Sequence, residues 1–322
     1  MNYRQLGKTG LKVSEVGFGA WGIGKMYWIG ANDDESLKAL HRSIELGLNF
    51  IDTAIGYGEG HSEKLIGQVV KQHNVPIYVA SKIPPKNYIW PAQPGTHADE
   101  AFPSEHIFAS TEQSLKNLDC ETIDIMQFHV WSDEWVGQGE WLDAIQRMKE
   151  QGKIRYFGVS INNYENSNVI ELVKSGVVDT VQLIYNIFDQ TAEDELFPAC
   201  EQYNVGVIVR VPLDEGGLTG AIKPDTTFAE GDFRNSFFQG DRKREVFERV
   251  NRIVEDLSIA PDEIAETALR FTLSHPAVST VIPGMRSVRN VERNMAVSDG
   301  RALPQEKLTK LKKHQWIRDF YS

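Results

Sequence analysis

Four side chains of types that serve in acid–base chemistry are Asp52, Tyr57, Lys82 and His129. Each lies at the end of, or shortly after, a short apolar segment typical of a buried strand. A free tyrosine has a pKa of about 10, too high for an acid at neutral pH, but a neighbouring ammonium lowers that pKa. Lys82 can supply this charge, Asp52 can orient Lys82, and His129 can donate a hydrogen bond to a substrate oxygen. Together they predict a site for proton transfer to a carbonyl group, a step typically worth about 10²–10⁴-fold in rate.

Each of the four residues, taken alone, also has an ordinary structural interpretation. An aspartate at a strand end often caps the next turn, and a tyrosine in a glycine-containing loop is usually a packing residue. A lysine at a strand end is usually solvated, and a single histidine more often satisfies a hydrogen bond than serves in catalysis. Their joint occurrence at the ends of three successive strands favours a functional site.

The elements that must position these residues alternate between short apolar strands and amphipathic helices. The strands are predicted at residues 13–22, 49–54, 77–82, 123–129, 154–160, 178–186, 205–211 and 278–284. The helices are predicted at residues 33–47, 63–72, 104–118, 141–152, 166–176, 192–203, 261–275 and 286–297. Eight such units predict a (β/α)₈ TIM barrel forming one domain over residues 1–322, with an N-terminal β-hairpin at residues 3–14. A doubly wound open sheet is the alternative, but no GxGxxG motif opens the first strand–helix unit.

Two long connections follow strands, at residues 83–103 and 214–243, and are therefore predicted at the C-terminal rim of the barrel. Aromatic residues in the loops suggest a pocket for a ring or sugar carbonyl, or else ordinary loop packing. The residues predicted to contact substrate are Trp21, Tyr88, Trp90 and Trp131.

Composition narrows the range of partners. The formal net charge of −11 argues against nucleic acid and anionic membranes. The two cysteines form no CxxC pair, so neither a disulfide framework nor a metal site is predicted. No apolar segment approaches the ~20 residues of a membrane span, and we expect a cytoplasmic protein. The oligomeric state is not predicted.

Residues 49–67, NFIDTAIGYGEGHSEKLIG, resemble the D-T-A-x-x-Y-G-x-G-x-S-E-x-x-x-G motif of the aldo-keto reductase family. The resemblance extends over nearly the whole chain, through VASK, IDIMQFH, GKIRYFGVS, VQLIYN and VSTVIPGMRSVRNVERN. It implies a (β/α)₈ barrel and an NADPH-dependent reductase of aldehydes or ketones. It also implies that Tyr57 is the acid, supported by Lys82 and Asp52, and that His129 aligns the carbonyl.

The same resemblance implies a binding site for NADP(H), which this family holds without a Rossmann motif. The residues implied for cofactor binding are Ala20, Trp21, Asp52, Ser160, Gln182, Arg210, Pro212, Leu213, Gly217, Leu218, Gly220, Gly284, Arg286, Asn290 and Asn294. Ser160 and Gln182 would hold the carboxamide, and the glycines after the seventh strand would bring backbone N–H groups to the pyrophosphate.

Arg286, Arg289 and Arg293 follow the last strand at spacings of three and four, so they are predicted on one helical face. Cations at a helix N-terminus oppose the helix dipole, which favours an anion bound between them. By resemblance this is the adenosine 2′-phosphate site, which favours NADP over NAD. The alternative is a solvated arginine face paired with Glu292.

The chain departs from the family pattern at three positions. Arg210 replaces the usual aromatic residue that stacks on the nicotinamide, and a guanidinium can also stack on a flat ring. Ile161 replaces the usual asparagine after Ser160, so one carboxamide contact is either missing or supplied by Asn162 or Asn163. Arg293 stands where a glutamate that contacts adenine is common.

The sequence therefore predicts a carbonyl reductase whose substrate is a small molecule. One alternative is a cofactor-binding accessory protein with the same fold and little turnover. Another is an unrelated barrel enzyme such as a metal-dependent hydrolase, for which a His-x-His pair or a carboxylate cluster would be expected, and only His129 qualifies.

Overall fold

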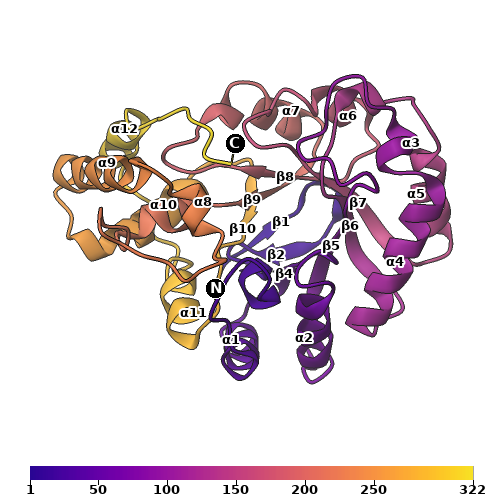
Figure 1. Ribbon diagram of the computed structural model, residues 1–322, viewed down its shortest axis with the longest axis horizontal. Coiled ribbons are helices and arrows are strands. Elements are labelled where there is room, and N and C mark those ends of the chain that lie inside the picture. The colour runs from indigo at the N-terminus through magenta and orange to yellow at the C-terminus, as the bar shows by residue number, and fades with distance from the viewer. Residues whose placement is uncertain (322) are drawn as a thin grey trace.

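The computed structural model describes residues 1–321 and has the predicted barrel at its centre (Figure 1). Within those residues, eight parallel strands pair in the order in which they follow along the chain. They are β3 (Phe18–Gly19), β4 (Phe50–Asp52), β5 (Tyr78–Ile83), β6 (Ile123–Phe128), β7 (Ile154–Ser160), β8 (Thr180–Ile184), β9 (Gly206–Arg210) and β10 (Val278–Val281). Parallel bridges from Val16 to Val281 and from Gly19 to Gly284 join the first strand to the last and close the barrel.

Helices cover the outside of the barrel, and Figure 1 shows them arranged around the strands. They are α1 (Asp33–Glu45), α2 (His61–Val70), α3 (Ala98–Ala101), α4 (Ser104–Leu118), α5 (Trp141–Glu150), α6 (Ile170–Ser175), α7 (Leu196–Gln202), α8 (Arg234–Phe237), α9 (Arg242–Leu257), α10 (Ile264–Leu273), α11 (Val288–Met295) and α12 (Gln305–Lys312). None of these helices is long and apolar enough to span a bilayer.

Helix α9 was not predicted, because residues 214–243 were assigned to a loop and the segment after them was left unassigned. The helix begins at Arg242 and buries Val246, Val250, Ile253 and Leu257. Spacings of four, three and four place these side chains on one face, so the periodicity that forms this helix is present in the sequence.

The N-terminal hairpin consists of β1 (Tyr3–Gln5) and β2 (Lys12–Ser14), as predicted. Its apolar side chains form a buried cluster with residues from the barrel strands and the segment after β10. The members of this cluster are Leu6, Leu11, Val13, Phe50, Ala80, Ile125, Ile208 and Ile282. The Lys8 amide donates to the Asn204 carbonyl at 2.7 Å, just before β9 begins. The hairpin therefore closes the amino end of the barrel, which leaves the carboxyl end as the accessible rim.

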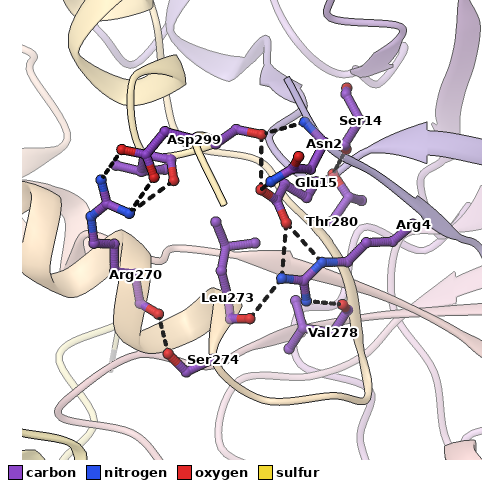
Figure 2. A network of polar contacts seen from close by, with 12 residues as sticks. Asn2, Arg4, Ser14, Glu15, Arg270, Leu273, Ser274, Val278, Thr280 and Asp299 are labelled. Carbon is purple, nitrogen blue, oxygen red and sulfur yellow. Dashed lines mark hydrogen bonds and ion pairs between the residues drawn. The ribbon is translucent and has the colours of Figure 1, made fainter. Parts of the chain in front are cut away.

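A polar network holds the hairpin in place (Figure 2). The buried Glu15 carboxylate accepts from Arg4 Nε at 2.9 Å and from Asn2 Nδ2 at 3.0 Å. The Arg4 guanidinium also donates to the carbonyls of Leu273 and Val278, at the end of α10 and the start of β10. Because every charge in this network has partners, it fixes the hairpin without leaving a buried polar group unsatisfied.

Candidate active site

The four residues predicted to act together come from adjacent strands, and the structure brings them to one rim. Asp52 ends β4, Tyr57 lies in the turn that follows, Lys82 is one residue before the end of β5, and His129 directly follows β6. Since β4, β5 and β6 pair in parallel, their carboxyl ends lie side by side.

Lys82 is at the centre of the group. Its ammonium nitrogen lies 2.5 Å from Asp52 Oδ1, 2.7 Å from the Thr53 carbonyl and 3.3 Å from the Tyr57 hydroxyl. Both charged side chains are almost fully buried, at 0% exposed for Lys82 and 2% for Asp52. Three acceptors satisfy the three N–H groups of Lys82, which makes a buried cation tolerable.

Asp52 is held by two glutamines, one from β6 and one from β8. Its Oδ2 atom accepts from Gln182 Nε2 at 2.7 Å and from Gln127 Nε2 at 3.2 Å. Gln182 was predicted only as a cofactor contact, and Gln127 was not singled out. The sequence signal was a glutamine between apolar residues in each of two strands, IDIMQF and TVQLI. These bonds orient the carboxylate that in turn positions Lys82.

The pKa of Tyr57 is raised above its ordinary value, whereas the sequence led us to expect a lower one. Burial of the phenol raises the pKa, and the Lys82 ammonium opposes that effect only in part. Burial disfavours the phenolate, and the sequence alone did not show how much of the ring is withdrawn from solvent. Tyr57 is consequently a neutral phenol at pH 7, the protonation state that a proton donor needs.

His129 is a neutral imidazole. Burial lowers its pKa well below the ordinary value, and the cations of Lys82 and Arg210 lower it further. Its ring centroid lies 5.9 Å from that of Tyr57, and the Trp90 ring packs edge-on at 5.2 Å. Among the described residues, no hydrogen bond engages the imidazole, so a ring N–H is available to a substrate oxygen.

A cavity of about 1530 Å³ opens at this rim, and most of the predicted contact residues line it. Those in its wall are Ala20, Trp21, Asp52, Tyr57, Tyr88, Trp90, His129, Ser160, Gln182, Arg210, Pro212, Leu213, Gly284, Arg286, Asn290 and Asn294. Lys82 lies outside this wall and reaches the cavity through the Tyr57 hydroxyl.

The structure contradicts the prediction that Trp131 contacts substrate. The side chain is fully buried and packs among Phe128, Trp135 and Trp141. Its indole N–H is used within the protein, by Asp133 Oδ1 at 3.0 Å. Trp131 is therefore part of the core behind the rim.

The prediction that Gly217, Leu218 and Gly220 approach the pyrophosphate is also corrected. None of these three residues lies in the cavity wall, which contains Gly216 and Thr219 from the same turn instead. Leu218 is fully buried, and a Cβ on Gly217 would meet Asp214 Oδ2 at 2.5 Å, which indicates a packing role. Gly216 has φ +102° and open space at its Cβ position. It is the glycine of this turn that can bring its backbone close to a ligand.

The three arginines after β10 lie in the cavity wall, and none of them forms a salt bridge within residues 1–321. Glu292, the predicted partner, instead pairs with Arg42 of α1 at 3.0 Å. Arg286 precedes α11, which begins at Val288, so the three do not share one helical face as predicted.

Burial lowers the pKa of Arg286, and the neighbouring Arg234 cation lowers it further. A half-buried cation beside another cation, at a helix N-terminus, is stabilised by a bound anion. The donor set of this part of the cavity therefore fits a phosphate group. Elsewhere in the cavity wall, Ser160 and Gln182 offer polar groups that fit an amide such as the carboxamide of nicotinamide.

A closed parallel barrel, with a tyrosine–lysine–aspartate–histidine group at its carboxyl rim and arginine cations in the wall of the same cavity, defines a carbonyl oxidoreductase. Comparison with known proteins agrees. A model of the aldo/keto reductase family matches residues 15–315, and the chain belongs to that family.

Similar proteins cover almost the full length of the chain. The chain is 29% identical over 307 residues to an aldo-keto reductase of Bacillus subtilis, YhdN, covering 91% of this chain and 87% of the relative. It is 29% identical to a probable voltage-gated potassium channel subunit beta of Arabidopsis thaliana, covering 93% and 92%. A solved aldo-keto reductase from Bacillus halodurans, in its holo form, superimposes with a TM-score of 0.75 at 27% identity, covering 98% and 96%.

Proposed function

We propose that this protein reduces an aldehyde or ketone to an alcohol, with NADPH as the hydride donor and Tyr57 as the proton donor. The observation that carries the proposal is the contact between the buried Lys82 ammonium and the hydroxyl of a neutral Tyr57, at 3.3 Å and beside His129. The arginines in the same cavity, whose charge fits a phosphate, support NADP(H) as the cofactor.

The roles of the side chains follow from their protonation states. His129, neutral, donates a hydrogen bond that orients the substrate carbonyl oxygen. NADPH, when bound, supplies the hydride to the carbonyl carbon. Tyr57 then gives its proton to the same oxygen, and the Lys82 ammonium stabilises the tyrosinate that remains. Asp52 keeps Lys82 charged and in place.

The cavity mouth indicates the kind of substrate. Tyr88 and Trp90 line it with 77% and 47% of their surfaces exposed, and Met26 and Tyr27 line it as well. Exposed aromatic residues around a polar catalytic group favour a carbonyl compound with a flat or partly apolar body, such as an aryl aldehyde or a sugar.

The direct test is a screen of aromatic, aliphatic and sugar carbonyls that follows the loss of NADPH absorbance. Each active compound should yield one alcohol per NADPH consumed, and deuterium from C4-labelled NADPH should appear on the carbinol carbon. Tight NADPH binding without turnover of any carbonyl would contradict the proposal. It would favour an accessory role instead, for which the similarity to the channel subunit is the supporting observation.

Binding of NADPH is expected to change the tryptophan fluorescence. Trp21 lies in the cavity wall, with its ring centroid 6.3 Å from that of Tyr57, so a nicotinamide placed to deliver hydride near Tyr57 must lie close to it. A titration of the wild type with NADPH measures the change, and Trp21→Phe should remove much of it. An unchanged spectrum at saturating NADPH would contradict this placement of the cofactor.

Replacing Arg286 with alanine is expected to reduce the preference for NADPH over NADH by about 10–100-fold, the effect of losing charge-assisted hydrogen bonds to a phosphate. The ratio of kcat/KM for the two cofactors measures it. The matched control is Arg155→Ala, which removes an arginine at the amino end of β7, where it pairs with Asp124. Equal losses with both cofactors would show that the 2′-phosphate is bound elsewhere.

A further inference from the structure

Arg210 ends β9 and faces the same cavity as Tyr57 and His129. Its Nη2 atom donates to Asn163 Oδ1 at 2.7 Å and to the Ile161 carbonyl at 3.2 Å, both on the segment after β7. Its Nε atom is buried and has no hydrogen-bond partner. Since both acceptors are neutral, they fix the direction of the guanidinium without forming an ion pair with it.

No carboxylate in residues 1–321 forms a salt bridge with Arg210, whose cation acts on Glu215 and Asp189 only through space. Burial raises the pKa of Glu215 to about 7, so at neutral pH this carboxylate is only partly ionised, and it accepts a hydrogen bond from the Tyr321 hydroxyl at 2.6 Å. Burial also raises the pKa of Asp189, whose Oδ1 atom accepts from Thr191. Asp52 is paired with Lys82.

The positive charge of Arg210 acts electrostatically on Tyr57 and His129, the groups proposed to take part in the reaction. The Arg210 cation lowers the pKa of Tyr57 and of His129, in each case as a smaller effect than burial. These shifts place the guanidinium within electrostatic range of the position where a carbonyl would bind.

Hydride and proton are delivered to the adjacent carbon and oxygen of one carbonyl group. The nicotinamide ring must therefore lie close to Tyr57, and so within range of Arg210. That ring is neutral in NADPH and carries one positive charge in NADP⁺. A fixed cation beside it destabilises the oxidised ring and leaves the reduced ring almost unaffected.

We propose that Arg210 makes this site discriminate between the redox states of its cofactor, weakening the binding of NADP⁺ relative to NADPH. The inference rests on the proposed function, because it requires the nicotinamide to bind beside Tyr57. Its consequence is that the free enzyme is loaded with the reduced cofactor and releases the oxidised one readily, which favours reduction over alcohol oxidation.

The test is a comparison of dissociation constants, measured by calorimetric titration of the whole protein with NADPH and, separately, with NADP⁺. The adenosine, the pyrophosphate and the 2′-phosphate are the same in both ligands. Any effect of Arg210 on those groups cancels in the ratio Kd(NADP⁺)/Kd(NADPH), which leaves the charge of the nicotinamide ring.

Arg210→Gln should lower this ratio by about tenfold or more, since at short range one unit charge is removed from beside another. Arg210→Lys should keep most of the wild-type ratio. Arg155→Gln, which removes an equal charge at the opposite end of the barrel, should leave the ratio unchanged. If Arg210→Gln does not fold, Arg210→Met provides the same charge removal with a side chain of similar length.

An unchanged ratio in the Gln or Met variant would overturn the proposal. Equal weakening of both cofactors would also overturn it, because Arg210 would then act on the phosphates or on the shape of the cavity. These outcomes are distinct from a failure of the proposed function. A protein that turns over no carbonyl still yields both dissociation constants, and an active reductase can still show an unchanged ratio.

Discussion

Replacing Tyr57 with phenylalanine is expected to lower kcat for carbonyl reduction by about 10²–10⁴-fold, the usual contribution of a positioned acid. The variant loses only the hydroxyl that lies 3.3 Å from Lys82 Nζ. Its ring still packs against Trp21 and His129, so cavity shape and NADPH binding should be preserved. Steady-state kinetics measure the loss, and a fluorescence titration checks that the cofactor still binds.

The control for this variant is Tyr3→Phe, which removes a hydroxyl bonded to the Gly47 carbonyl at the closed end of the barrel. It should leave kcat near the wild-type value. If Tyr57→Phe keeps near-full activity, the proton comes from another donor, and the assigned role of Tyr57 is wrong.

Replacing Lys82 with methionine is expected to destabilise the protein by about 3–5 kcal/mol, because it leaves the Asp52 carboxylate buried without its cation. Both partners are almost fully enclosed, so solvent does not screen the charge that remains. Urea denaturation followed by circular dichroism measures the change in the free energy of unfolding. Activity should fall as well, since the tyrosinate formed in the reaction would lose its stabilising cation.

The double variant Asp52→Asn with Lys82→Met separates charge burial from loss of packing. It should recover part of the lost stability, because the asparagine introduced by Asp52→Asn carries no charge and its amide can still bond Gln127 and Gln182. If Lys82→Met alone costs less than about 1 kcal/mol, or the double variant is less stable than the single one, unpaired charge is not the cause.

The path of the chain through the barrel was largely predictable, and so were the rim positions of the four reactive residues. Each short apolar segment became a strand of the barrel, and Asp52, Lys82 and His129 lie at or next to the ends of β4, β5 and β6. The hairpin was predicted from its turn, although its burial inside the barrel floor was not. Helix α9 was missed although its periodicity was present.

The site was predicted less completely, and the errors have a common cause. Trp131 is two residues beyond His129 in the sequence, yet it points into the aromatic core while His129 faces the cavity. Gly216 and Gly217 are neighbours, and only Gly216 lines the cavity. In irregular loops the direction of each side chain depends on local dihedral angles. No regular spacing of residues in the sequence predicts that direction.

The sequence by itself determined which residues stand at the carboxyl rim, because parallel strands of a closed barrel place all their ends on one side. It also determined the chemical types available there: a phenol, an ammonium, a carboxylate, an imidazole and a set of arginines. Only the tertiary structure decided their protonation states and their hydrogen-bond partners. Burial keeps Tyr57 and His129 neutral, two glutamines from β6 and β8 hold Asp52, and neutral acceptors hold the guanidinium of Arg210. These outcomes depend on enclosure and on distances between segments far apart in the chain, which the order of residues does not encode locally.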